Sequence, residues 1–346
     1  MGIGPGQNDV RKLQSTGGST FTVSLPKPWV IAQGLEARDS LRVDWRPSGA
    51  LRITPLDSQE QILHQSFFST KTLPRNSLHD HLMGAYIAGS DEIYVDCKPE
   101  EAKEISGQIR RFLRSTRGFE IMDESSKGIL LKCLMNAGDM PLHASLNRMY
   151  LQVTSLARDI LSVFDGEERN YIEDAEERES EVDALLYLID RQVRILLDSH
   201  FVATKLNLTR TQALEYANLA RALERMMDHA FSIATLILEH PKITKNMIEM
   251  TPLEQLPRWQ SSLKELMINI RIRDSHRIEQ ARQDLKQSQQ RLLEHEKNVL
   301  QNHRSNEWMA FDLRLSESVR RLCAYARDFG EILLNMKVFS EIHRKM

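Results

Sequence analysis

The chain has 346 residues, of which 41% are hydrophobic, 27% charged and 6% aromatic, and its formal net charge is −2. That length suggests roughly two or three domains, and that composition favours a helix-rich soluble protein over an all-β one. Because the chain as a whole is not a polycation, any contact with nucleic acid must come from a local basic patch.

Cysteine usage and apolar runs indicate the compartment. Cys97, Cys133 and Cys323 are far apart and form no CxxC pair, which is typical of a reducing cytosol. The first residues contain no apolar signal-peptide segment, and no apolar run approaches the length of a transmembrane helix. We therefore expect a cytoplasmic protein without membrane insertion.

Residues 1–58 form the first predicted domain, a unit of short strands and turns. Hydrophobic residues at alternate positions indicate half-buried strands, and a helical turn over residues 29–33 ends at Gly34. The expected strands cover residues 11–13, 20–25, 41–45 and 51–53. Such a small unit cannot bury a good core alone, so we expect two copies to interleave as a homodimer.

Residues 59–137 form the second predicted domain, a small α+β layer. One helix is expected over residues 77–88, and a second from Pro99 to about residue 115. The expected strands cover residues 92–97, 119–123 and 128–134.

Residues 138–346 form the third predicted domain and are almost entirely helical in pattern. The expected helices cover residues 141–164, 167–199, 209–240, 254–275, 277–304 and 308–343. Two sets of three long helices predict two three-helix bundles side by side, at about 138–240 and about 250–346. The predicted fold class is therefore mostly α, with a β domain at the N-terminus and a small α+β domain in the middle.

An acidic run over residues 165–183 contains ten acidic and two basic residues. Acidic residues near a helix N-terminus commonly form a solvated face. Glu179 and Asp183, however, share one face of their helix, and Glu224 and Asp228 repeat this spacing on the next helix. If antiparallel helices bring the two pairs together, the four carboxylates must be protonated or bridged by a cation.

An all-oxygen set of this kind suits a hard divalent cation or iron, so we expect Mg, Mn, Zn or Fe in the first bundle and no organic cofactor. None of the eleven histidines has Glu three residues before it, which argues against the Glu-x-x-His pairs of ferritin-like di-iron bundles. His79-Asp80-His81 is a second candidate cluster, but a helix start on the surface explains it better.

The segments EVDALLYLID (181–190) and RALERMMDHAFSIA (221–234) resemble the PhoU family of phosphate-uptake regulators. The resemblance covers about residues 140–346 and is carried by the four carboxylates and by the small residues after Asp228. It implies two repeated three-helix bundles with E/D-x-x-x-D metal motifs on adjacent helices, in a protein that is a regulator and not an enzyme.

The second bundle departs from this pattern. When its last helix is aligned with the helix that carries Glu224 and Asp228, Arg320 replaces the Glu and Ala324 replaces the Asp. The helix expected to face them offers two polar residues at the same spacing, Gln280 and Asp284. Because an arginine competes with a metal ion, we expect one metal-competent cluster in the first bundle and a degenerate one in the second.

The segment RKLQSTGGSTFTVSLPKPWVIAQGLEARDSLRV (11–43) resembles the SpoVT/AbrB family of swapped-hairpin DNA-binding domains. The shared features include Leu25-Pro26-Lys27, Trp29 and Asp39. The resemblance implies that two chains interleave their hairpins into one barrel. Arg38 departs from the pattern, since the family often carries Gly before this Asp.

Residues 1–58 contain seven basic and five acidic side chains, a net charge of +2. Contacts to phosphates supply most of the affinity of a DNA-binding protein and make it salt-dependent. The residues expected to contact DNA are Arg11, Lys12, Lys27, Arg38 and Arg42.

Together the two segments resemble archaeal phosphate-uptake regulators that fuse an AbrB-like head to a PhoU body. This resemblance implies a transcriptional regulator of phosphate transport that binds promoter DNA as a dimer. The helical body would sense phosphate status through a metal or through a protein partner, such as the ATPase subunit of a transporter.

Two other functions compete with this hypothesis. A signalling adaptor would bind a phosphate transporter or sensor protein and use its N-terminal domain only to dimerise. A metal-dependent hydrolase built on the four carboxylates is disfavoured, because the sequence has neither a Gly-rich phosphate loop nor a G-x-S-x-G elbow. Salt-dependent binding to promoter fragments would separate the regulator from the adaptor.

Overall fold

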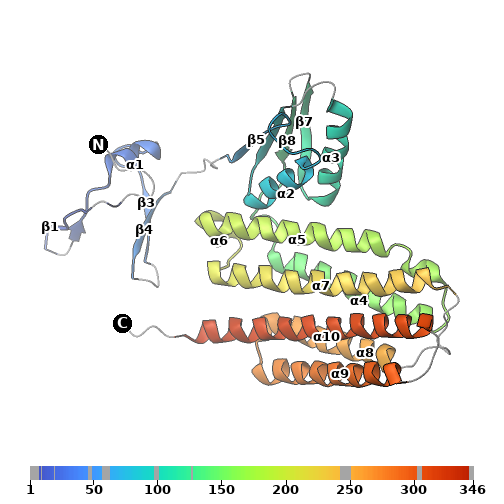
Figure 1. Ribbon diagram of the computed structural model, residues 1–346. Helices are drawn as coiled ribbons and strands as arrows, with labels where there is room; N and C mark the ends of the chain where they lie inside the picture. The colour runs from blue at the N-terminus through green and yellow to red at the C-terminus, as the bar shows by residue number, and fades with distance from the viewer. Residues whose placement is uncertain are drawn as a thin grey trace. The chain divides into compact units, whose positions relative to one another are not determined.

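The computed structural model describes most of the chain. The described residues are 8, 10–18, 20–45, 49–56, 63–96, 101–125, 128–241, 251–301 and 306–342. The chain divides into two compact units, unit 1 (residues 1–62) and unit 2 (residues 63–346). Figure 1 labels most of the helices and strands of both units.

The first half of unit 1 is a tight hairpin. β1 (Gln14–Thr16) and β2 (Thr20–Thr22) pair antiparallel, and the turn between them contains Gly17 and Gly18 with φ angles of 68° and 81°. Glycine adopts such angles without the strain that a Cβ atom would cause. The first strand begins at Gln14, three residues later than the strand expected at residues 11–13.

The second half of unit 1 is a helical turn followed by another hairpin. α1 (Lys27–Ala32) follows Pro26 and is ended by Gly34, whose φ is 62°. β3 (Leu41–Trp45) and β4 (Leu51–Pro55) then pair antiparallel over their whole length. These elements lie where the sequence pattern predicts them.

Among its described residues, unit 1 of a single chain buries Pro55 and no larger hydrophobic side chain. The exposed fractions are 65% for Phe21, 57% for Val43 and 77% for Trp45. Burying one large apolar side chain stabilises a fold by about 1.5–3 kcal/mol. The described part of unit 1 therefore lacks the core that would hold it together as a monomer.

Unit 2 begins with a four-stranded sheet in the order β5-β6-β8-β7, in which β5 and β6 are parallel and the other neighbours antiparallel. Its strands are β5 (Gln65–Ser69), β6 (Glu92–Asp96), β7 (Phe119–Ser125) and β8 (Gly128–Cys133). α2 (Leu78–Ala88) connects the parallel strands, and α3 (Ala102–Ser115) precedes β7.

One face of this sheet carries the core of the layer. Ile93, Val95 and Leu131 are fully buried and pack with Tyr86 of α2 and Phe112 of α3. The prediction of a small α+β layer did not include β5. Cys97 and Pro99, which the prediction placed at the end of a strand and the start of a helix, lie outside the described residues.

In the described part of unit 2 after the sheet, six long helices form two sets of three (Figure 1). The first set is α4 (Leu142–Phe164), α5 (Ala175–Asp198) and α7 (Arg210–Glu239), and the second is α8 (Thr251–Ile272), α9 (Ser275–Gln301) and α10 (Asn306–Glu341). Packing of α10 on α7 joins the two sets, and one continuous hydrophobic core runs from Leu142 to Met336. The predicted fold class, mostly α with a small N-terminal β region, is confirmed.

Two details differ from the predicted helices. The helix expected over residues 167–199 starts at Ala175, and a 3-10 turn, η2 (Arg169–Ile172), precedes it. The guanidinium of Arg169 donates to the carbonyl of Ile237 in the last turn of α7 and to that of Pro241 just beyond it, so this segment closes the end of another helix. A short helix, α6 (His200–Lys205), also lies between α5 and α7. None of the described helices is long and apolar enough to cross a membrane.

Candidate functional site

The first bundle places α5 and α7 side by side (Figure 1). An ion pair of 2.8 Å between Arg221 Nη2 and Asp190 Oδ2 connects them. Asp183 lies about two turns before Asp190 on α5, and Asp228 lies about two turns after Arg221 on α7. These two carboxylates are close enough for their charges to interact. The two helices therefore run antiparallel.

The acidic run at the start of α5 divides between two roles. Arg178 forms ion pairs of 2.9 Å with Asp174 and 2.6 Å with Asp159, and Glu181 pairs with Arg148 at 2.7 Å. These acids hold the bundle together or face solvent, as a charge run usually does. Glu179 and Asp183, by contrast, turn towards α7.

Four half-buried carboxylates interact across α5 and α7. Burial, followed by the neighbouring Asp228 carboxylate, raises the pKa of Glu224 to about 7 and that of Asp183 to about 6. Burial also raises the pKa of Glu179, helped by the charges of Asp183 and Asp228. It raises the pKa of Asp228 as well, against the opposing effect of Arg225. We name these four residues the carboxylate cluster.

The raised pKa values fix the sign of a pH effect. A carboxyl group whose pKa is higher in the folded than in the unfolded protein binds its proton more tightly when folded. The folded state therefore loses stability as the pH rises from the ordinary carboxyl value near 4 towards about 7, the raised pKa of Glu224. The carboxylate cluster is thus poised to change charge around neutral pH.

The carboxylate cluster fits a metal ion only in part. Its donor atoms are all oxygen, which suits a hard cation, and a bound cation would relieve the repulsion among the four carboxylates. Within the part of the chain that the structure describes, however, no three acidic, His or Cys side chains are gathered so that they could hold one ion. Binding of Mg, Mn, Zn or Fe here stays a prediction, and it requires the side chains to draw together.

Tyr187 is part of this site, although the sequence reasoning missed it. Burial raises its pKa, and the charges of Asp183, Glu224 and Glu179 raise it further. The same side chain packs against the core of the α+β layer. Its position one turn after Asp183 on α5 was a usable signal, since i,i+4 residues share a helix face.

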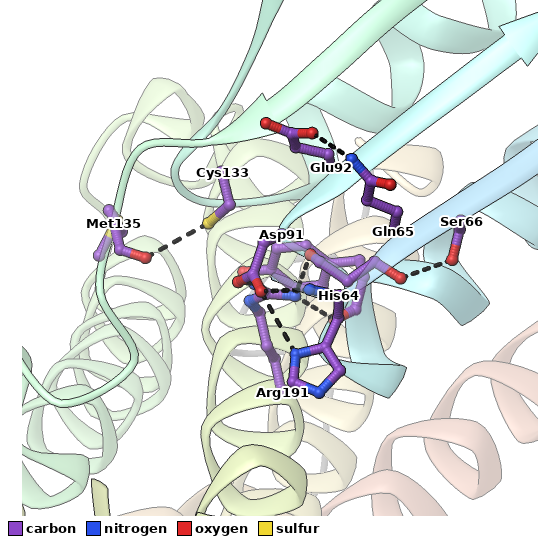
Figure 2. A network of polar contacts seen from close by, with 10 residues as sticks. His64, Gln65, Ser66, Asp91, Glu92, Cys133, Met135 and Arg191 are labelled. Atoms are coloured by element: carbon purple, nitrogen blue, oxygen red, sulfur yellow. Dashed lines mark hydrogen bonds and ion pairs between the residues drawn. The ribbon is translucent and has the colours of Figure 1, made fainter. Parts of the chain in front are cut away.

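One turn further along α5, Arg191 anchors the bundle to the α+β layer (Figure 2). Its side chain is 4% exposed. Nη1 donates to the carbonyls of Tyr86 and Ser90, both at 2.8 Å, at the C-terminal end of α2, where a cation is favoured. The guanidinium also lies 5.2 Å from the Tyr86 ring centroid and 5.5 Å from that of Phe119.

Arg191 continues into a polar network at the start of unit 2 (Figure 2). Its Nη2 is 3.4 Å from Asp91 Oδ1, and the other oxygen of Asp91 accepts the backbone N–H of His64 at 3.0 Å. His64 Nδ1 lies 3.3 Å from that oxygen, and the carbonyl of His64 accepts from the backbone of Asp91 at 2.7 Å. The contacts thus run from α5 to the residues that follow unit 1 in the chain.

In the second bundle, the arginine that replaces a motif acid pairs with an acid of the neighbouring helix. Arg320 Nε contacts Glu296 Oε1 at 3.0 Å, and Ser316 donates to the same oxygen at 3.1 Å. The expected opposition of Arg320 to Gln280 and Asp284 is wrong, because those two bond to each other at 2.9 Å on an exposed part of α9. The antiparallel pairing of α9 with α10 brings residues near the α9 C-terminus to Arg320 instead.

The basic residues expected to contact DNA are all exposed on unit 1. They are Arg11, Lys12, Lys27, Arg38 and Arg42. Arg42 is partly engaged within the chain, since its Nε lies 3.0 Å from Asp44 Oδ1.

Arg38 stands where the SpoVT/AbrB family often carries Gly, and its backbone adopts a conformation that glycine favours. Its φ is 87°, a left-handed conformation that costs a non-glycine residue about 1 kcal/mol or more. Asp39 Oδ2 accepts the backbone N–H of Glu36 at 2.7 Å and closes the turn. An arginine thus occupies a glycine-like position in spite of its strain.

Comparisons with known proteins agree with part of this description. Residues 146–237 match the model of the PhoU domain, a range that contains the whole carboxylate cluster. The structure is similar to the crystal structure of the phosphate transport system regulatory protein PhoU from Streptococcus pneumoniae, with a TM-score of 0.46 and 16% sequence identity over 59% of this chain and 96% of that chain. No curated protein matches the sequence. The PhoU part of the predicted resemblance is therefore confirmed over the first bundle, and its SpoVT/AbrB part and an archaeal origin stay predictions.

Proposed function

We propose that this protein is a transcriptional regulator of phosphate uptake, in which a dimer of unit 1 binds promoter DNA and the helical part of unit 2 senses phosphate status. The observation that carries the proposal is the PhoU domain match over residues 146–237. The role is regulatory and not enzymatic, with a phosphate-transporter ATPase subunit or a sensor protein as the partner of the helical body.

The exposed apolar side chains of unit 1 support its dimerisation. Large side chains that remain more than half exposed in one copy are buried when two copies interleave their hairpins. We expect the full chain to be a dimer in light scattering, and Phe21→Glu to make it monomeric. Leu151→Glu, a matched change of a half-exposed leucine on α4, leaves the dimer intact. A dimer that survives Phe21→Glu contradicts this part of the proposal.

DNA binding is tested with fragments from upstream of phosphate-transporter genes. Replacing Arg11 and Lys12 together by Ala weakens binding and lowers the salt slope by about 1–2, because each phosphate contact releases a counterion. The matched control replaces Arg110 and Arg111 of α3, an exposed basic pair of unit 2, and leaves binding unchanged. Absence of binding above background at low salt favours the signalling adaptor.

Arg38 offers a sharper test, because one substitution there is expected to raise the stability of unit 1 and to lower its affinity for DNA. Arg38→Gly relieves the left-handed strain and raises the stability of unit 1 by about 1 kcal/mol. It also removes a cation that we assign to DNA contact, so affinity for promoter DNA falls. A variant that is more stable and binds as tightly as the wild type shows that Arg38 does not contact DNA.

The route from sensing to DNA follows one face of α5. Glu179, Asp183, Tyr187 and Arg191 are spaced four residues apart, and Arg191 reaches Asp91. We expect DNA affinity to change between about pH 6 and pH 8 as the carboxylate cluster ionises, and Arg191→Met to abolish that change while binding persists. Arg194→Met, an exposed neighbour on α5, retains it. Persistence of the pH response in Arg191→Met contradicts this route.

A divalent cation at the carboxylate cluster is proposed as the alternative to protons. Titration with Mg²⁺, Mn²⁺, Zn²⁺ or Fe²⁺ raises the melting temperature of the wild type and has no effect on a variant with Glu224→Gln and Asp228→Asn. An equal shift in both proteins places the bound ion elsewhere.

A further inference from the structure

A cleft of about 550 Å³ opens in the α+β layer, away from the carboxylate cluster. It lies at the carboxyl end of the parallel strands β5 and β6, where ligands collect in open sheets with parallel strands. Thr70 follows β5 and Glu101 precedes α3, and both line the cleft. Its volume is in the range of small-molecule sites.

The walls of the cleft carry opposite charges. Arg75, from the loop between β5 and α2, is exposed and has no ion-pair partner among the described residues. Glu101 and Glu104, from the start of α3, also line the cleft. Leu73, Leu78 and Ile105 add an apolar surface to its lining.

Hydrogen bonds fix these walls in place. Thr70 Oγ1 donates to Glu101 Oε2 at 2.6 Å and ties the end of β5 to the start of α3. Gln108 Oε1 accepts the backbone N–H of His79 at 3.2 Å and ties α3 to the first turn of α2. The cleft is therefore preformed, and the exposed side chains of Arg75 and Glu104 both line it.

We propose that this cleft binds a free amino acid with an apolar side chain. The carboxylate of the ligand pairs with Arg75, its ammonium group with Glu104 and Glu101, and its side chain packs on Leu78 and Ile105. A phosphate or nucleotide suits the cleft less, since two carboxylates oppose one guanidinium and repel a multiply charged anion. This assignment goes beyond the proposed function and adds a second effector to the chain.

Calorimetric titration of the full-length protein with each of leucine, isoleucine, valine, methionine and phenylalanine, up to about 10 mM, tests the assignment. We expect at least one of them to bind, and Arg75→Gln and Glu104→Gln each to weaken its affinity about tenfold or more. Arg110→Gln, an exposed arginine of α3 outside the cleft, retains wild-type affinity.

Three results would overturn the assignment. They are the absence of heat with all five amino acids, unchanged affinity in Arg75→Gln, and binding of inorganic phosphate or AMP that Arg75→Gln abolishes while amino acids do not bind. Both cleft variants change exposed side chains, and an unchanged melting temperature without ligand shows that they fold.

Discussion

The two helical bundles are built from similar helix pairs, but they place different neighbours beside their acidic side chains. In the first, Glu179 and Asp183 face Glu224 and Asp228 at half-buried positions, and their pKa values rise. In the second, Arg320 contacts Glu296 and His295 contacts Asp312, while burial and the charge of Glu331 raise the pKa of Asp328. Similar helix pairs therefore carry a group of four interacting carboxylates in the first bundle and two paired acids in the second.

The largest expected effect is in the second bundle. His295 and Asp312 are each 3% exposed, and His295 Nε2 lies 3.0 Å from Asp312 Oδ1. His295→Phe leaves the buried carboxylate without this partner and lowers the free energy of unfolding by about 3 kcal/mol in urea titrations. Lys297→Met, an exposed change two residues away, has almost no effect. A loss below about 1 kcal/mol in His295→Phe would show that the pair is not structural.

Arg320 is expected to be the second most sensitive position. Arg320→Met removes the guanidinium beside Glu296, leaves the hydrogen bond from Ser316, and costs about 2 kcal/mol. Arg320→Glu costs more because it adds repulsion. Arg321→Met, the exposed next residue, serves as the control. If the Met and Glu variants are equally stable, charge pairing is not what Arg320 supplies.

In the first bundle, removing a charged side chain is expected to stabilise the fold instead of destabilising it. Glu224→Gln removes a carboxylate whose pKa is raised to about 7. At pH 8 it raises the free energy of unfolding by about 1 kcal/mol, discounted because half-buried carboxylates are still partly screened by water. At pH 4, where Glu224 is protonated in the folded protein, the gain disappears. The exposed Glu294→Gln on α9 is the control. An equal gain from Glu224→Gln at pH 4 and pH 8 would show that the pKa of Glu224 is not raised in the folded protein.

The smallest effect belongs to Ala324→Asp, which restores one acid of the motif to the second bundle. Arg320 lies one turn before it and can pair with it, so the cost is about 0.5 kcal/mol. In the background of Arg320→Met the same change costs about 1 kcal/mol more, and the difference between the two costs measures the pairing. Equal costs in both backgrounds would mean that Arg320 does not neutralise this position.

Local pattern was sufficient for most helices and for the carboxylate cluster. The stripe containing Val182, Leu185 and Ile189 sets which face of α5 is buried, and the spacing of Glu179 and Asp183 then follows from helix geometry. Gly17-Gly18 and Gly34 likewise predict the turns of unit 1, because few other residues adopt their φ angles.

Local sequence patterns did not predict the contacts between segments that are distant in the chain. β5 is a short edge strand that forms only because β6 pairs with it in parallel, so its own five residues carry little signal. The network of Arg191, Asp91 and His64 joins residues about one hundred positions apart. The partner of Arg320 likewise depended on the register between α9 and α10, which side-chain packing sets.

By itself, the sequence determined which stretches form the six long helices, which of their faces are apolar, and that two acidic pairs share the spacing of a helical turn, because these are properties of neighbouring residues along one chain. Only the tertiary structure decided which acids are half-buried beside other carboxylates, which arginine anchors the bundle to the sheet, and where a cleft opens. Those outcomes depend on desolvation and on distances between atoms far apart in sequence, and both are set when the helices and strands pack together.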